Sequence, residues 1–198
     1  MKIIITGNIG SGKSSVTKIF EKEGYFVISA DEISHEILKD NHVKIAKYFS
    51  MPPQQFDTFK KKLSNMVFSN NIWYDGKTFK EHLENIMLPL INEKINYLSS
   101  ECEKNNKKYV VEAPTFFEVN GLKHFAENFI ILIQTDKDIR IQRIMERNKH
   151  LSIQDVLDRI KSQIDPFEKE EFSDKIIWNN NGINDLEIKI FELIKSME

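Results

Sequence analysis

A glycine-rich segment directly after a short apolar run is the strongest constraint on this chain. Residues 7–14 read Gly-Asn-Ile-Gly-Ser-Gly-Lys-Ser, which matches G-x-x-x-x-G-K-[ST], and they follow the apolar run Ile3–Thr6. Val16, Ile19 and Phe20 then recur at helical spacing. A strand, a glycine-rich loop and a helix in this order are typical of a phosphate-binding loop. The alternative is a glycine-rich turn that matches by chance, but both flanking elements favour binding of a nucleoside triphosphate.

The residue types in this segment suit a triphosphate chemically. Gly7, Gly10 and Gly12 remove Cβ atoms where the backbone must approach phosphate, and successive N–H groups at the start of the helix attract negative charge. Lys13 adds a cation for the terminal phosphates. The hydroxyl of Ser14 can bind a Mg²⁺ ion that the triphosphate also binds. We therefore expect a nucleoside triphosphate with Mg²⁺.

Length and composition limit the class of protein. The 198 residues suit one domain with room for an inserted lobe. The formal net charge of -2 does not indicate a nucleic-acid coat or a membrane clamp. Cys102 has no second cysteine to pair with, and no apolar run approaches the roughly 18 residues of a membrane helix. We therefore expect a cytoplasmic protein with no nucleic-acid or membrane partner, and a monomer by default.

Strand-like runs alternate with helical patterns along the chain. The runs are Ile3–Thr6, Phe26–Ser29, Tyr109–Glu112, Phe129–Gln134 and Ile176–Trp178. This alternation is typical of a parallel sheet with helices on both faces. The long gap at about residues 32–108 holds helical patterns, punctuated by Pro52-Pro53 and Ser69-Asn70-Asn71. The sequence therefore predicts a three-layer α/β fold with a five-stranded parallel sheet and a helical insertion.

Two acidic residues follow strand-like runs, at the sheet edge where ligands bind in open α/β folds. Asp31 could accept a proton from a hydroxyl that faces the γ-phosphate, or hold a metal-bound water. The alternative for Asp31 is a helix N-cap. Glu112 could lie near Mg²⁺, or could be only a solvated strand end. The sequence leaves both pairs of alternatives open.

Basic residues form two groups after the loop. Arg140, Arg143 and Arg147 have the spacing of one helix face, and Arg159 lies on the next helical segment. Guanidinium groups on a mobile lid stabilise the charge that develops during phosphoryl transfer. Salt bridges to nearby carboxylates are the alternative for these arginines. The run at residues 60–62 is three lysines, interpreted as a solvated helix face, with contact to an acceptor phosphate as the alternative.

Several segments together resemble the dephospho-coenzyme A kinase family. They are the loop Gly7–Ser14, the turn Ser29–Asp31, the segments Leu83–Ile91 and Glu112–Glu118, and the stretch from Gln142 to Asn179. The loop is generic to phosphate-binding folds, whereas the order and spacing of the later segments are particular to this family. The resemblance implies a P-loop kinase fold with an acceptor-binding lobe at about residues 32–108 and a lid at about 140–170. It also implies ATP-dependent phosphorylation of the ribose 3′-hydroxyl of dephospho-coenzyme A, the last step of coenzyme A synthesis.

The resemblance also implies roles for individual residues. The ATP cradle comprises Gly10, Ser11, Gly12, Lys13, Ser14 and Ser15. Asp31 becomes the base for the 3′-hydroxyl, and Arg143 and Arg147 become lid or nucleotide contacts. Pro114 and Glu118 are expected near the acceptor. Catalysis is thus expected from Asp31 together with Lys13 and Arg143.

The chain departs from the family pattern at several positions. It has Ser29 where the family usually has an aspartate, Leu88 in place of a histidine, and Lys60 in place of an arginine that binds the acceptor. Asn148-Lys149 replaces Asp-Gly after Arg147. These changes concern the position of the acceptor more than the binding of ATP.

Other classes share parts of this pattern. A nucleoside monophosphate kinase has a similar loop and lid but phosphorylates a nucleotide phosphate. A non-catalytic nucleotide-binding module would hold ATP without transfer. A GTPase switch is disfavoured, because the sequence contains no Asn-Lys-x-Asp segment and no Asp-x-x-Gly after the third strand-like run.

Overall fold

The computed structural model describes residues 2–67, 73, 75–117 and 128–197. The chain divides into two compact units. Residues 1–29 and 98–198 form the first, here called the sheet unit, and residues 30–97 form the second, here called the helical lobe. Each unit is described by itself.

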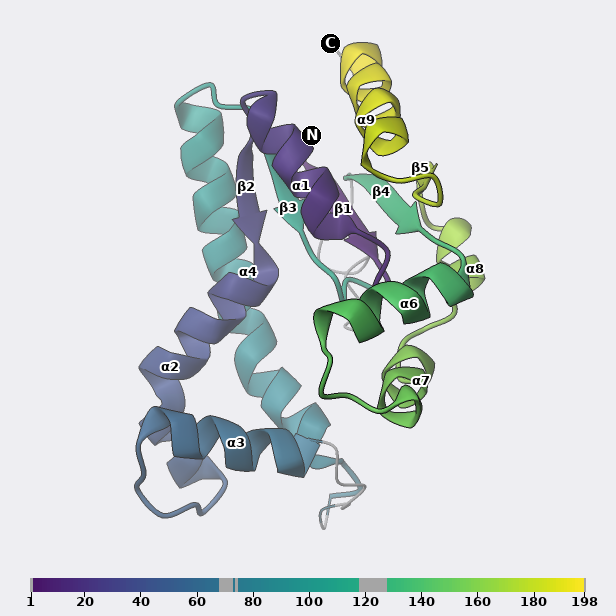
Figure 1. The fold of residues 1–198 in the computed structure, drawn as a ribbon. Coiled ribbons are helices and arrows are strands. Elements are labelled where there is room, and N and C mark those ends of the chain that lie inside the picture. The colour runs from purple at the N-terminus through teal and green to yellow at the C-terminus, as the bar shows by residue number, and fades with distance from the viewer. Residues whose placement is uncertain (1, 68–72, 74, 118–127, 198) are drawn as a thin grey trace. The chain divides into compact units, whose positions relative to one another are not determined.

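The predicted strands form one parallel sheet in the sheet unit (Figure 1). The strands are β1 (Ile3–Gly7), β2 (Phe26–Ser29), β3 (Tyr109–Glu112), β4 (Phe129–Gln134) and β5 (Lys175–Trp178). Their order across the sheet is β2-β3-β1-β4-β5, and every neighbouring pair is parallel. The central strand β1 carries the glycine-rich segment at its carboxyl end, so the phosphate-binding loop lies at the middle of the sheet.

Both faces of this sheet are buried. Ile3 and Ile5 of β1 belong to an apolar cluster that includes residues of α1 (Lys13–Lys22) and α9 (Ile183–Met197), which lie on the same side of the sheet (Figure 1). Ile4 projects to the opposite face and is fully buried as well. Continuous apolar runs such as β1 arise because strands of a parallel sheet must be covered on both sides. The predicted three-layer α/β fold is confirmed.

Three short helices follow β4 in the sheet unit. They are α6 (Lys137–Arg147), α7 (Ile153–Lys161) and α8 (Pro166–Glu170). Ser152 and Asp155 form a capping box at the start of α7, in which each side chain binds the other residue's N–H. Asp165 caps α8, whose first residue is Pro166. These caps fix where α7 and α8 begin, so Asp165 also marks the end of the connection between the two helices.

The helical lobe contains α2 (Ala30–Tyr48), α3 (Phe56–Val67) and most of α4 (Phe79–Lys104), which continues beyond Tyr97 into the sheet unit. Its core comprises Ile45, Ala46, Phe49, Phe59, Leu63, Phe79 and Met87. Pro52-Pro53 lies between α2 and α3, as the sequence predicted, whereas residues 69–71 lie outside the described residues. In the described parts of the chain, no helix combines the length and the apolar character that crossing a membrane requires.

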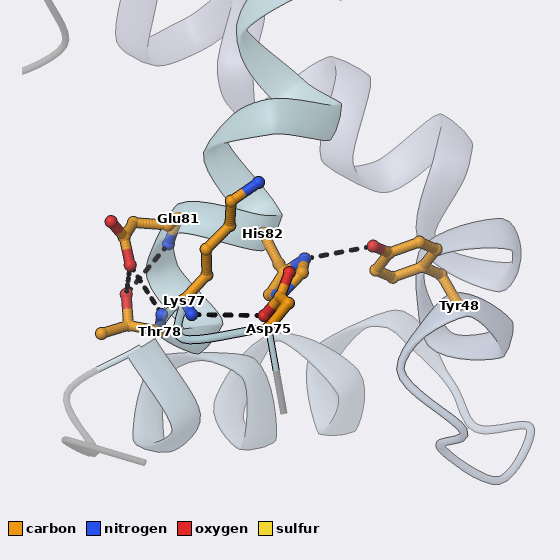
Figure 2. A network of polar contacts seen from close by, with 6 residues as sticks. All are labelled: Tyr48, Asp75, Lys77, Thr78, Glu81 and His82. Atoms are coloured by element: carbon orange, nitrogen blue, oxygen red, sulfur yellow. Dashed lines mark hydrogen bonds and ion pairs between the residues drawn. The ribbon is translucent and has the colours of Figure 1, made fainter. Parts of the chain in front are cut away.

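A polar network fixes the first turn of α4 in the helical lobe (Figure 2). The main-chain N–H of Thr78 donates to a carboxylate oxygen of Glu81 (2.6 Å), and the N–H of Glu81 donates to the hydroxyl of Thr78 (3.2 Å). This reciprocal pair is a capping box. His82 bridges Asp75 and Tyr48, with Nε2 3.2 Å from the Asp75 carboxylate and Nδ1 3.1 Å from the Tyr48 hydroxyl. The buried histidine thereby joins α2 to the start of α4.

We expect acid to weaken this end of the helical lobe. Hydrogen bonds from Thr78 lower the pKa of Glu81 from 4.5. Burial raises the pKa of Asp75, but hydrogen bonds from the Lys77 N–H and from His82 outweigh it, so that this pKa is lowered from 3.8. Carboxylates with lowered pKa values stabilise the fold above the unfolded-state pKa, and that stability is lost as pH falls through the folded-state value.

Denaturant unfolding between pH 3 and pH 7, followed by Trp73 fluorescence in a protein that carries Trp178→Phe, measures this loss. Glu81→Gln should flatten the acid dependence, because the titrating group is gone. Glu93→Gln, which removes an exposed carboxylate further along α4, is the matched control. An acid dependence that is equally steep in wild type and Glu81→Gln would contradict the prediction.

Candidate active site

The loop between β1 and α1 has the backbone of an anion site. α1 begins at Lys13, and its N-cap Gly12 is left-handed, with φ 94°. Within the described residues, no side chain caps this end and no acidic residue lies in its first turn. No capping side chain therefore competes with phosphate for this helix start and for the positive end of the helix dipole.

Lys13 lies across the loop that precedes it. Its Nζ donates to the carbonyl of Gly7 (2.7 Å) and lies 3.3 Å from the carbonyl of Asn8. Phosphate oxygens are stronger acceptors for an ammonium group than carbonyls, so a triphosphate can take over these contacts. Ser14 is exposed on the first turn of α1, and Ser15 beside it is half-buried. The predicted cradle, Gly10–Ser15, is thus a continuous loop and helix start.

Two residues from other strand ends hold the loop in place. The amide of Asn179, after β5, donates to the carbonyl of Ser11 (2.9 Å), and the hydroxyl of Thr135, after β4, donates to the same carbonyl (3.1 Å). A Cβ on Gly12 would collide with the Asn179 side chain. A glycine is therefore needed at position 12 for two reasons: the backbone is left-handed, and the Asn179 side chain lies too close for a Cβ.

We expect Gly12→Ala to disrupt the loop, because it adds a steric collision to backbone strain. Gly24→Ala is the matched control: Gly24 also has a positive φ (83°), but a Cβ there would meet no atom within 4 Å. The left-handed strain alone costs about 1–2 kcal/mol. Gly12→Ala should lose more unfolding free energy than the control and weaken ATP binding at least about tenfold. Equal losses of stability with unchanged ATP affinity, by calorimetry, would rule out this role of Gly12.

The four predicted arginines lie in different environments. Arg143 on α6 donates to the carbonyl of Asn179 (3.0 Å) and lies 3.4 Å from the Thr135 hydroxyl, beside Gly12. Arg140 is buried, donates from Nε to the Ile9 carbonyl (3.1 Å), and has its pKa lowered by burial, against an opposing effect of Asp165. Arg147 and Arg159 are exposed. Within the described residues none of the four forms an ion pair, so the salt-bridge alternative gains no support.

The structure adds residues that local sequence patterns did not select for the site. Gln163 accepts a hydrogen bond from the Ile9 N–H (2.7 Å), and Asn8 donates to the carbonyl of Ile164 (2.9 Å). The fully buried Lys169 donates to the Asn8 side chain (2.8 Å). Gln163 and Lys169 lie within the stretch up to Asn179 on which the family resemblance partly rests. The segment after α7 therefore holds the first half of the loop.

Glu112 ends β3 beside the strand that carries the loop. In the sheet register it lies opposite Ile5 of β1 and Ser29 of β2, and its side chain is half-buried. This places a carboxylate at the carboxyl edge, one strand from the loop. Pro114 lies in the turn that follows β3, whereas Glu118 lies outside the described residues.

Asp31 and Lys60 both lie in the helical lobe, and Lys60 contacts the helix that carries Asp31. α2 begins at Ala30, so Asp31 lies inside its first turn rather than at the N-cap position that the capping alternative required. His35 follows one turn later on the same face, and its Nδ1 lies 3.3 Å from the Nζ of Lys60 on α3. His35 was missed by the sequence reasoning, although its spacing of four from Asp31 was a usable signal. Leu88, which replaces the family histidine, is half-buried within α4.

A parallel sheet with an intact phosphate-binding loop, braced by residues from α6 and from the ends of β4 and β5, defines a phosphotransferase of the P-loop kinase class. Residues 1–185 match the family model described as dephospho-CoA kinase. A dephospho-CoA kinase from Helicobacter pylori is 35% identical, over 98% of this chain and 96% of the relative. The chain belongs to the dephospho-CoA kinase family.

Solved structures agree on the fold. A dephospho-CoA kinase from Campylobacter jejuni is 33% identical and superposes with a TM-score of 0.72, over 100% of this chain and 98% of that one. A shikimate kinase from Acinetobacter baumannii, in complex with shikimate, is 17% identical with a TM-score of 0.54, over 100% and 94% of the two chains. The second likeness shows the shared fold alone.

Proposed function

We propose that this chain transfers the γ-phosphoryl group of ATP to the ribose 3′-hydroxyl of dephospho-coenzyme A, giving coenzyme A and ADP. The observation that carries the proposal is an intact phosphate-binding loop in a chain whose residues 1–185 match the dephospho-CoA kinase family. The reaction is the last step of coenzyme A synthesis.

On the donor side, the main-chain N–H groups of Gly10–Ser15 bind the phosphates, and Lys13 neutralises their terminal oxygens. Arg143 lies beside Gly12 and can reach the nucleotide by exchanging its contact with the Asn179 carbonyl. Arg147 is exposed at the end of α6 and would join from the lid, at about residues 140–170. Cations placed in this way stabilise the charge that grows on the transferred group.

Magnesium fits this site as an ion that arrives with the nucleotide. Within the described residues, no cluster of three His, Cys, Asp or Glu side chains could hold a metal by itself. The exposed hydroxyl of Ser14 suits Mg²⁺, which takes few protein ligands and keeps phosphate oxygens and water. Glu112 would contribute through a bound water. When bound, the ion would neutralise charge on the phosphates.

On the acceptor side, the helical lobe would receive dephospho-coenzyme A. Asp31 would accept the proton of the 3′-hydroxyl as the phosphoryl group is transferred. Lys60 is held beside His35 and would bind an acceptor phosphate. Pro114 and Glu118 would contact the acceptor. A cytoplasmic location and a monomeric state also remain predictions.

An acceptor panel tests the proposal. Purified protein is mixed with ATP and Mg²⁺, and ADP release is followed with dephospho-coenzyme A, nucleoside monophosphates and shikimate as separate acceptors. We expect ADP release that depends on dephospho-coenzyme A, with coenzyme A as product. Release with a nucleoside monophosphate instead would identify a nucleotide kinase, and ATP binding without any acceptor-dependent release would identify a non-catalytic module.

A further inference from the structure

A pocket lies in the sheet unit, lined by the ends of β4 and β5, the first turns of α6 and the connection from α7 to α8. Its volume is about 360 Å³. The lining includes Asn8 but none of the proposed cradle residues 10–15. Ligand pockets typically measure about 300–1,000 Å³, so the space suits a small molecule. The pocket therefore lies outside the proposed cradle, although part of its lining belongs to the proposed lid at about residues 140–170.

Arg140 gives this pocket an unsatisfied cation. The side chain is only 3% exposed, and its Nε is bound to the Ile9 carbonyl. Its Nη2 is buried and has no hydrogen-bond partner within the described residues. A buried charged donor without a partner is rare, because it loses hydration and gains nothing in return. Since Arg140 also lines the pocket, a shift of its guanidinium group would let an acceptor on a bound ligand supply the missing partner.

The other charges around the pocket favour an anion. Lys137 and Lys161 line it together with Arg140, against the carboxylates of Asp136 and Asp165. Asp165 caps α8, because its Oδ1 accepts a hydrogen bond from the Phe167 N–H, and its charge still acts on Arg140. Asp136 precedes α6 but makes no side-chain cap bond, so the N–H groups of that first turn add positive partial charge.

The remaining lining is partly polar, with Gln134, Thr135 and Gln163, and partly apolar. Ile160 and Ile164 contribute aliphatic surface, and Trp178 and Phe167 contribute aromatic surface. Both rings are partly exposed, Trp178 at 38% and Phe167 at 68%. A bare inorganic ion would leave these walls unused, whereas an ester with an apolar or planar group would cover them.

We propose that this pocket binds a small organic phosphate monoester, with Arg140 Nη2 as the central donor, Lys137 and Lys161 as further cations, and Trp178 against the organic group. The three cations exceed the two carboxylates by one charge, and a phosphate offers more acceptor oxygens to the guanidinium and both ammonium groups than a carboxylate does.

A fluorescence titration tests the pocket. The protein carries Trp73→Phe, so that Trp178 is the reporter, and the loop is filled with Mg²⁺ and a non-hydrolysable ATP analogue. Phenyl phosphate should change Trp178 fluorescence saturably and bind more tightly than inorganic phosphate or benzoate. Arg140→Gln should weaken phenyl phosphate binding at least about tenfold, and Lys161→Gln about threefold. Lys149→Gln, an exposed charge outside the pocket lining, should leave binding unchanged.

Three outcomes would overturn the inference: no saturable response with the loop filled, an affinity unchanged by both pocket substitutions, or benzoate binding as tightly as phenyl phosphate. If Arg140→Gln does not fold, Lys161→Gln decides the matter, because it leaves the contact between Arg140 and Ile9 in place. The titration measures no phosphoryl transfer, so its failure is separate from failure of the proposed function.

Discussion

Replacing Lys13 by methionine is expected to lower kcat/KM for ADP formation about 10³-fold, the upper end for removal of one charged group that stabilises a transition state. Lys13 is the loop's own cation, and its Nζ already lies at hydrogen-bonding distance from the Gly7 carbonyl. Methionine keeps much of the side-chain volume but removes the charge. The loss should appear mainly in kcat, because the charge on the γ-phosphoryl oxygens changes most in the transition state.

Lys18→Met is the matched control, since Lys18 is exposed on the same helix. It should leave both kinetic constants within about twofold, as expected for a surface charge distant from the reacting group. Steady-state kinetics with dephospho-coenzyme A as the acceptor measure both variants, and circular dichroism checks that both fold. If Lys13→Met retained more than a tenth of wild-type kcat/KM, the loop would have to act without its lysine.

The sheet could be predicted from the sequence because its buried strands consist largely of apolar residues. Three predicted runs, including Phe26–Ser29, match the strands of the structure, and β1 and β5 each extend one residue further. A parallel strand must be apolar on both faces, so it reads as a short continuous run. The loop could be predicted for a similar reason, because its glycines and lysine are adjacent in the chain.

The contacts that hold the loop could not be predicted in this way. Gln163 meets Ile9 across 154 positions, and Asn179 meets Ser11 across 168. Hydrophobic periodicity reports only local geometry, and long-range polar pairs leave no local signal. Asn8 also occupies a variable position of the loop motif, so its contact with Lys169 becomes visible only in the structure.

The substitution Asp31→Asn tests whether Asp31 is the general base for the acceptor hydroxyl, because the structure alone is compatible with two roles for this residue. In the first turn of α2 a carboxylate stabilises the helix dipole whether or not it takes part in a reaction. A general base, in contrast, is needed only while the 3′-hydroxyl loses its proton. Asparagine keeps the shape and the hydrogen-bonding acceptor but cannot take that proton. We therefore expect kcat to fall by about 10²- to 10⁴-fold with little change in KM.

Glu32→Gln separates the two roles, because Glu32 is the neighbouring acidic residue of the same helix turn. If Asp31 served only the dipole, both substitutions would lower the melting temperature by a similar small amount and neither would lower kcat. If Asp31 is the base, only Asp31→Asn loses turnover, and it also loses the acid limb of the profile of kcat/KM against pH, since that limb reports protonation of the base. A near-wild-type kcat for Asp31→Asn would show that Asp31 only stabilises its helix and that another group accepts the proton.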